Sequence, residues 1–595
     1  MQNVSELPDG FASRALPLIP IILAAILFLV GLTRTDLWTP DEPRYALVAR
    51  EMLDRGSIIQ PFCNGKPYTE KPPLFFWLIM IGAKIFGDVN QLAVRLPSVL
   101  SALGTITLMI GFVKQYVGRK AAGWSAVVLA LSPLFFWLAR SGHIDMLLTF
   151  LVTAGLVSFY RWHRGEEVKR KKEKGETEEA EEEGKRKEKK GKRQEAEGAR
   201  QEGGRWGYLV IFYACLALGT LAKGPVGMVL PLLVVVVFAL LKRNARELLR
   251  MRLHIGLPLA IAAVLAWYIP ASVQSAGYSA GNVVGRQIIE RVLAAGPHSV
   301  SPWMWPFAAA LSLLWGMAPW SVLLPFAAVA IWRERRSSDA RFFMLAWAMA
   351  ILGFFTVISS KRELYLLPMF PACAAMAGSW LADECERRIG MLRRMAMIAG
   401  VVTAVGAAVA MVAGPGVLHN RYPEVEWPPL LNVLAAGALC SGAAVAVFAA
   451  KARSGQRIAM AGSAMLTCAF AAIALFVLPW VNQSKSPRPI CDIYRSLRTD
   501  DSRLGMFREG MLDEEFVFYS RTQIELMRSA AQLDAFMDSP GPRFCFARKN
   551  EFERIRGALK SPFSVLAERR VSSYVVLLLW NQNQRPDAMA AKEER

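Results

Sequence analysis

The segment PVGMVLPLLVVVVFALL at residues 225–241 is followed at once by KRNARELLRMR at residues 242–252. The first run contains no charged side chain. At about 1.5 Å per residue, a helix of its length comes close to the thickness of the hydrocarbon core of a bilayer. The second run is rich in Lys and Arg, which gather on the cytoplasmic side of membrane proteins. We therefore predict a membrane-spanning helix that ends in the cytoplasm.

Runs of the same kind recur along most of the chain. Hydrophobic residues make up 54% of the 595 residues and the mean hydropathy is +0.29, which excludes a set of water-soluble domains. The first run, 16–33, has no small-residue cleavage site behind it, so we interpret it as a retained span rather than a signal peptide. The further predicted spans are 92–113, 120–139, 144–160, 207–222, 225–241, 254–272, 305–331, 341–358, 363–382, 395–414, 428–450 and 458–480.

Basic residues give the chain a formal net charge of +21 and determine the predicted topology. In a soluble protein this charge would suggest nucleic acid. Here the basic residues sit in short loops between apolar runs, so we expect no nucleic-acid partner. The clusters expected in the cytoplasm are 114–120, 161–205, 242–252, 333–341, 387–394 and 451–457. The eight cysteines are scattered singly, which indicates neither a zinc site nor a disulfide scaffold.

Only one crossing fits between the first outer loop, 34–73, and the basic loop at 114–120, although two apolar runs lie there. The shorter run, 74–87, contains Lys84 and is short for a span, so we predict an interfacial or re-entrant helix. About thirteen crossings then satisfy the charge rule. The N-terminus is expected in the cytoplasm and the C-terminus outside.

The chain divides into a predicted transmembrane domain, 1–480, and a C-terminal domain, 481–595, on the outer side. In the tail, apolar runs such as 516–518 and 574–579 alternate with polar helical stretches such as 524–537, which indicates a small α/β domain. The segment 164–205 is a Lys/Glu/Gly-rich insertion that we expect in the cytoplasm, either disordered or as a solvated helix. The expected fold class is mainly α, with a polytopic membrane domain.

The region 34–90 differs from the other outer segments because its loop is long, polar and rich in ionisable groups. It reads LWTPDEPRYA at 37–46 and NGKPYTEKPPL at 64–74. Asp41 and Glu42 beside Arg44 can form a general-base site, in which one acid accepts a proton while the arginine holds a phosphate or the partner acid. The alternative is a solvated loop with surface ion pairs.

The pattern Trp-x-Pro-Asp-Glu-x-Arg-Tyr at 38–45, followed by Tyr-x-Glu-Lys-Pro-Pro at 68–73, resembles the bacterial lipid-sugar-dependent glycosyltransferases. This family contains the lipid A aminoarabinose transferase and the protein O-mannosyltransferases. The likeness extends over most of the membrane region, through RSGHID at 140–145, AKG at 222–224, PH at 297–298 with PW at 302–303, and SKRELYLLP at 360–368. Each of these motifs falls in a loop that the charge rule places outside.

The resemblance implies a membrane fold of the GT-C type and an active site on the periplasmic side of a bacterial inner membrane. It makes Asp41 the catalytic carboxylate, with Glu42 as its neighbour, and makes Lys71 a ligand of the carrier phosphate. It also makes Glu70 and His298 candidate ligands of a divalent metal such as zinc, magnesium or manganese.

A departing polyprenyl phosphate needs positive charge on its oxygens, from lysine, arginine or a metal. The residues that can supply it are Lys71, Arg44, Lys223 and Arg291. Further donor-binding candidates from the same motifs are Tyr68, Asp145 and Tyr365.

The acceptor stays open at this point. One hypothesis is an inverting transferase that moves a sugar, such as 4-amino-4-deoxy-L-arabinose, from undecaprenyl phosphate to lipid A or another envelope acceptor. With a phosphate acceptor Asp41 need not remove a proton, whereas with a hydroxyl, as in protein O-mannosyl transfer, it must act as a base. A lipid or sugar transporter is disfavoured because the ionisable groups crowd the outer rim and no two halves are alike.

Overall fold

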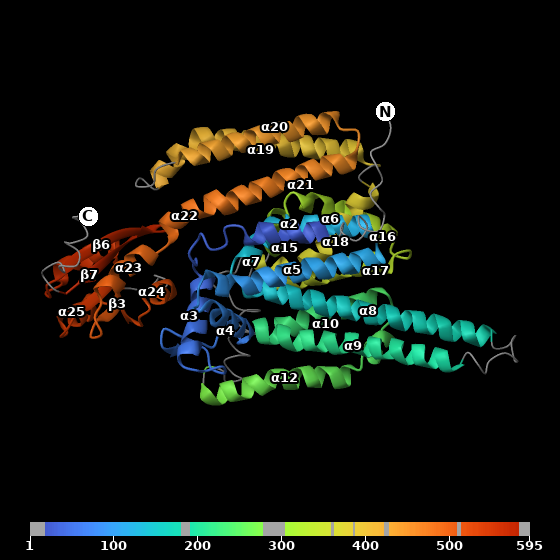
Figure 1. The fold of residues 1–595 in the computed structure, drawn as a ribbon, viewed down its shortest axis with the longest axis horizontal. Coiled ribbons are helices and arrows are strands. Elements are labelled where there is room, and N and C mark those ends of the chain that lie inside the picture. The colour runs from blue at the N-terminus through green and yellow to red at the C-terminus, as the bar shows by residue number, and fades with distance from the viewer. Residues whose placement is uncertain are drawn as a thin grey trace.

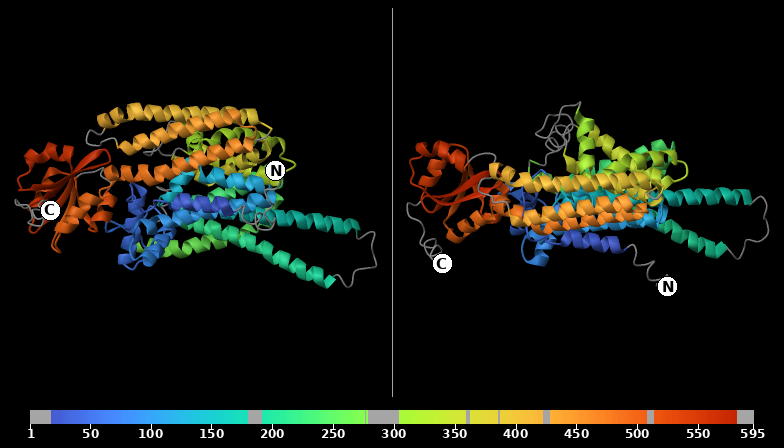
Figure 2. Two further views of the ribbon diagram at one scale, coloured as in Figure 1. Left: turned by 45° about the horizontal axis from the view of Figure 1, so that its top comes forward. Right: turned by 90° about the horizontal axis from the view of Figure 1, so that it is seen from above.

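The computed structural model describes residues 18–179, 191–275, 277, 304–358, 362–384, 387–421, 428–507 and 513–581. Most of them form a helix bundle, with a small C-terminal domain at one end and the extensions of α8 (Ile144–Glu179) and α9 (Gly191–Lys223) at the other (Figure 1, Figure 2). Nine of the described helices are long and apolar enough to cross a membrane, or up to eleven if each of two bent pairs counts as one span. The chain is thus a multi-pass membrane protein, while the count of thirteen stays a prediction.

The long helices agree with predicted spans in place and in order. Besides α8 and α9 they are α5 (Gln91–Tyr116), α12 (Leu253–Gln274), α17 (Asp339–Val357), α18 (Phe370–Glu384), α19 (Ile389–Arg421), α20 (Pro429–Lys451) and α21 (Gly455–Ala472). The helices α2 (Leu18–Leu29) and α10 (Val226–Leu241) are apolar but shorter. Within the predicted insertion 164–205, α8 continues to Glu179 and α9 begins at Gly191, so the described part of it is helical.

Two of the predicted spans are pairs of helices with a sharp bend between them. The segment 120–139 consists of α6 (Arg119–Ala130) and α7 (Pro133–Arg140), which meet at 66°, and 305–331 consists of α15 (Trp305–Gly316) and, after the short helix η4 (Trp320–Leu323), α16 (Leu324–Arg333), with a bend of 117°. Prolines 133 and 319 lie at these breaks. A proline has no backbone N–H to donate and its ring clashes with the preceding turn, so it interrupts a helix.

The first outer region folds as two helices outside the bundle. α3 (Asp41–Asp54) leads through a hairpin of β1 (Phe62–Cys63) and β2 (Lys66–Pro67) to α4 (Leu74–Phe86). The 13 residues of α4 span about 20 Å, too little to cross the hydrocarbon core. Figure 1 shows α3 and α4 at the end of the bundle that faces the C-terminal domain. The short α4 at the end of the bundle agrees with the predicted interfacial or re-entrant helix, whose place in the membrane stays a prediction.

The C-terminal domain begins after α22 (Leu478–Lys485) with α23 (Arg488–Leu497) and contains a five-stranded mixed sheet. The strand order is β4 (Ile524–Met527), β3 (Arg503–Phe507), β5 (Arg543–Arg548), β7 (Tyr574–Trp580) and β6 (Ser564–Val571). The helices α24 (Asp513–Ser520), α25 (Ala530–Asp538) and α26 (Lys549–Ile555) complete it. The small α/β domain is thus confirmed.

Two details of the tail prediction are wrong. The apolar run 516–518 lies inside α24, and the stretch 524–537 begins with strand β4 before its helix starts at Ala530. α24 reads DEEFVFYS, so its four apolar or aromatic residues, 516–519, are consecutive and its polar residues lie at the two ends. A short continuous apolar run does not show whether a segment is a strand or a helix.

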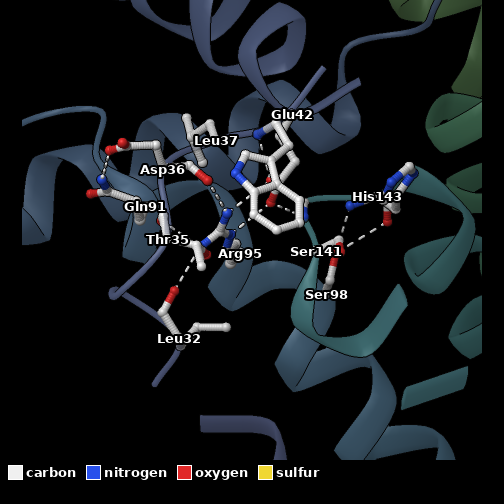
Figure 3. A network of polar contacts seen from close by, with 12 residues as sticks. Leu32, Thr35, Asp36, Leu37, Glu42, Gln91, Arg95, Ser98, Ser141 and His143 are labelled. Carbon is white, nitrogen blue, oxygen red and sulfur yellow. Dashed lines mark hydrogen bonds and ion pairs between the residues drawn. The ribbon is translucent and has the colours of Figure 1, made fainter. Parts of the chain in front are cut away.

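A buried guanidinium fixes the start of α3 to the membrane bundle (Figure 3). Arg95 of α5 donates to both carboxylate oxygens of Glu42, from Nε at 2.7 Å and from Nη2 at 2.9 Å. Its Nη atoms also donate to the carbonyl oxygens of Leu32, Thr35 and Asp36 at 2.6, 3.0 and 2.7 Å. One side chain therefore holds both α3 and the loop that precedes it.

The C-terminal domain holds the same loop and helix from the other side. The Tyr519 hydroxyl accepts from the Leu37 N–H at 2.6 Å, and Glu514 accepts from Arg44 Nε at 2.7 Å. The buried carboxyl of Glu515 contacts Thr39 through hydrogen bonds to its backbone and side chain. Burial raises the pKa of Glu515 to about 7, although these hydrogen bonds act to lower it. α3 is thus held between two domains.

Replacing Arg95 by Met should destabilise the protein by about 3–5 kcal/mol, because the buried Glu42 carboxylate loses its counter-charge. Chemical unfolding of the purified protein in detergent measures this loss. The double variant Glu42→Met/Arg95→Met, which buries no charge, should recover part of the stability. Native stability of Arg95→Met would contradict the anchoring role.

The contact between the domains should weaken as the pH rises through 7. Since the pKa of Glu515 is raised from 4.5 to about 7 in the folded protein, its stabilising contribution is present below pH 4.5 and is lost above pH 7. Melting temperatures at pH 5.5 and 8 should therefore differ less in Glu515→Gln than in the native protein. The exposed control Glu525→Gln should keep the native difference. The same pH response in both variants would exclude Glu515 as its source.

Candidate active site

Asp41 is the first residue of α3 and lies buried among basic groups. Its Oδ2 atom is 3.4 Å from Arg362 Nη2 and 3.8 Å from His143 Nδ1, and its Oδ1 accepts from the Tyr45 hydroxyl at 3.3 Å. Burial alone would raise the pKa of Asp41, but the nearby charges of His143, Arg362 and Arg44 outweigh it and keep the pKa below the usual value. The carboxylate is therefore ionised and is a weak base.

Two cavities meet at Asp41. One, of about 280 Å³, contains Trp38, Glu42, Arg95, Arg140, His143 and Lys485 in its wall. The other, of about 200 Å³, is lined by Lys71, Asp145, Lys223, Phe354, Phe355 and Tyr365. Asp41 and Arg362 line both. A carboxylate at this junction can face two substrates that enter from different sides, which suits a group transfer.

The second cavity combines basic groups with an apolar wall. Lys223 forms an ion pair with Asp145, and its Nζ lies 4.7 Å from the centre of the Tyr365 ring. Tyr365 in turn stacks on Phe355 with ring centres 5.6 Å apart. Together with Lys71, these residues suit a ligand that carries an anionic phosphate on a hydrocarbon chain.

The structure thus brings together five predicted site residues in one cavity wall: Asp41, Lys71, Asp145, Lys223 and Tyr365. Arg44, Tyr68 and Glu70 lie beside this wall without being part of either cavity lining. Arg44 pairs with Glu514 and lies 3.9 Å from Glu70, which also receives the Tyr68 hydroxyl at 3.5 Å. We infer that these three residues support the site rather than contact the reacting atoms.

The geometry does not favour the predicted catalytic role of Glu42. Besides the two bonds from Arg95, its carboxylate accepts from the N–H groups of Gly142 and Trp38 at 2.9 and 3.0 Å. All of these donors belong to the protein itself, so the carboxylate oxygens of Glu42 have little remaining ability to accept a proton or to bind a substrate. Glu42 therefore positions Asp41, its neighbour in α3.

The predicted metal has no site in the described part of the chain. No three His, Cys, Asp or Glu side chains there could together hold an ion. His298 and the donor-binding candidate Arg291 lie outside the described residues, and the remaining candidate Glu70 is 60% exposed at its side chain. One exposed carboxylate offers too few ligands for a divalent ion, so the metal stays a prediction that rests on the family resemblance.

Sequence reasoning missed Arg362, Arg95 and Arg140 as site residues. Arg362 lies within the motif at 360–368, and Arg140 is the first residue of the motif at 140–145. Neither motif by itself indicates a binding or catalytic role for its arginine. Arg95 carried a clearer signal, because a charge within an apolar span is costly unless it has a partner. What the sequence did not reveal was that this partner is Glu42.

Comparison with known proteins gives relatives of one kind. The family model of dolichyl-phosphate-mannose-protein mannosyltransferases matches residues 70–171. An undecaprenyl phosphate-alpha-4-amino-4-deoxy-L-arabinose arabinosyl transferase of Aeromonas salmonicida is 26% identical over 95% of this chain and 93% of its own. The enzyme of the same name from Serratia proteamaculans is 25% identical over 69% of this chain and 67% of its own.

Solved structures of known proteins share the fold of this chain. The crystal structure of ArnT from Cupriavidus metallidurans bound to undecaprenyl phosphate superimposes with a TM-score of 0.77 and 20% identity, covering 97% of this chain and 100% of that one. Its apo form gives a TM-score of 0.74. The GT-C fold is thereby confirmed. The relative from Aeromonas salmonicida matches almost the whole chain, so the chain is similar in sequence to the undecaprenyl phosphate-aminoarabinose arabinosyl transferases and shares the fold of ArnT.

Proposed function

We propose that the protein transfers 4-amino-4-deoxy-L-arabinose from undecaprenyl phosphate to a phosphate group of lipid A. The names of the relatives support the sugar and its carrier. The observation that supports the acceptor is the position of Asp41 between Arg362 and His143. We further propose that the reaction takes place at the periplasmic face of the inner membrane, with the N-terminus in the cytoplasm and the C-terminal domain in the periplasm.

The electrostatics of Asp41 favour an acceptor that needs no general base. A hydroxyl acceptor must lose its proton during attack, and a base serves this best when its pKa is near the working pH. The pKa of Asp41 is instead held below its usual value. A phosphate of lipid A is already ionised at neutral pH, so its oxygen can attack without help. The same argument disfavours transfer to a serine or threonine of a protein.

The first cavity suits the acceptor phosphate. Arg140 lines it, and its buried Nε has no hydrogen-bond partner among the described residues, while its Nη1 donates to the carbonyls of Leu27 and Phe28 at 2.7 and 3.0 Å. Lys485, from the end of α22, lines the same cavity and lies 4.8 Å from the centre of the Trp38 ring. Both side chains can attract a dianionic group.

The second cavity suits the donor, with its phosphate near Lys71, Lys223 and Arg362. The acceptor oxygen forms a bond to the anomeric carbon as the bond from that carbon to the carrier phosphate breaks. The electron pair leaves with undecaprenyl phosphate, whose growing charge the three cations stabilise. Asp41 faces the anomeric carbon, orients the sugar and stabilises its positive charge. No proton has to move in this step.

Replacing Asp41 by Asn should lower the transfer rate by at least about 100-fold, because the removed charge acts on the transition state. Proteoliposomes that contain the purified protein, lipid A and an undecaprenyl-phosphate sugar allow the rate to be measured by mass spectrometry of lipid A. The matched control is Asp54→Asn, an exposed carboxylate at the far end of the same helix, which should keep the native rate. Native activity of Asp41→Asn would refute the catalytic assignment.

Dephosphorylated lipid A should not be modified in the same proteoliposomes, because its hydroxyl groups require a base that Asp41 does not provide. Lipid A with its phosphates should carry the new sugar on phosphorus, which tandem mass spectrometry locates. Transfer to a serine-containing peptide at a comparable rate would instead show a protein acceptor and contradict the proposal.

A further inference from the structure

A groove of about 490 Å³ lies between α2, α6 and α21 and shares no residue with the two cavities around Asp41. Its walls are apolar or small, with Leu23 of α2, Gly123 and Trp124 of α6, and Met460 of α21 among them. Leu23 and Met460 are 52% and 55% exposed. Apolar surface open to this extent faces lipid in a membrane protein and offers a place for a hydrocarbon chain.

The mouth of the groove is basic. Arg119 and Lys120, the first residues of α6, line it and are both exposed. No aspartate or glutamate is among its lining residues, and the polar ones are limited to Gln456, Ser463 and Thr467. The groove is therefore electrostatically complementary to an anion with an apolar tail.

The length of the groove along α6 matches the thickness of one leaflet of a bilayer. The lining residues of α6 run from Arg119 to Leu131, a rise of about 18 Å, which is close to half of a hydrocarbon core of about 30 Å. The basic mouth lies at the start of α6, at the end of the bundle away from the C-terminal domain (Figure 1). A headgroup at this mouth would thus have its acyl chain within the same leaflet.

We propose that this groove binds an anionic glycerophospholipid. Its phosphodiester lies against Arg119 and Lys120, and one acyl chain follows the groove past Gly123 toward Leu131. Basic pockets between membrane helices at the cytoplasmic side hold anionic headgroups by the same combination of charge and apolar contact. The site is independent of the sugar-transfer chemistry, since no residue of the candidate active site belongs to it.

Filling the groove without changing its charge tests the proposal first. A Cβ atom added at Gly123 meets nothing within 4 Å, so Gly123→Leu fits on its helix and occupies the space of the acyl chain. Native mass spectrometry of the full chain in detergent, titrated with phosphatidylglycerol, measures the retained lipid. Gly123→Leu should lose this lipid, whereas Gly437→Leu, at an equally open glycine of α20, should retain it. Equal retention in both variants overturns the proposal.

The second test removes the positive charge at the mouth of the groove. Arg119→Gln/Lys120→Gln should bind phosphatidylglycerol about 25-fold more weakly, at a contribution of about 1 kcal/mol from each cation. The control Arg335→Gln/Arg336→Gln removes two adjacent exposed arginines outside the groove and should bind like the native chain.

The choice of lipid tests the chemistry of the ligand. Affinity for phosphatidylcholine equal to that for phosphatidylglycerol would overturn the assignment of an anionic headgroup. Tighter binding of undecaprenyl phosphate at the same residues would overturn the assignment of a glycerophospholipid. If phosphatidylglycerol does not bind to the full chain but binds after residues 1–15 are deleted, the groove belongs to the chain's own N-terminal segment, and the proposal is overturned.

Discussion

The buried ion pair between Arg95 and Glu42 is the interaction on which the site depends. Arg95 belongs to helix α5 of the bundle and Glu42 to α3 at its end, so their two short hydrogen bonds connect the bundle with the region 34–90. Separating such a pair leaves a buried charge, which is much more costly than the pair is stabilising. The ion pair therefore also fixes the position of Asp41, the residue before Glu42.

The second constraint comes from the domain that follows the bundle. Tyr519, Glu514 and Glu515 of the C-terminal domain contact α3 and the loop before it, the same segment that Arg95 holds from the bundle. Asp41 is thus held by both parts of the chain, although the sequence places them more than 400 residues apart. Restricting the start of α3 in this way keeps the carboxylate aligned at the junction of two cavities, which is the preorganisation that group transfer requires.

Much of this organisation could be predicted from the sequence, because membrane spans follow from local runs of apolar residues. The short helix α4 at the end of the bundle followed from the same reasoning, and the motifs identified Asp41, Lys71 and Lys223 as neighbours in a common site. The pairing of side chains from distant parts of the chain could not be predicted in this way. Whether Glu42 acts in catalysis or pairs with Arg95 depends on contacts between distant segments. Pro133 and Pro319 mark where two segments bend, but a proline alone does not give the bend angle. The apolar run 516–519 of α24 is continuous and has no helical period.

Cryo-electron microscopy of the full chain in a lipid nanodisc, with a non-transferable undecaprenyl-phosphate sugar, would show where the donor binds. We expect the phosphate against Lys71 and Lys223 and the anomeric carbon within about 3.5 Å of the Asp41 carboxylate. A phosphate bound beside Arg44 and Glu70, with the sugar outside both cavities, would contradict it.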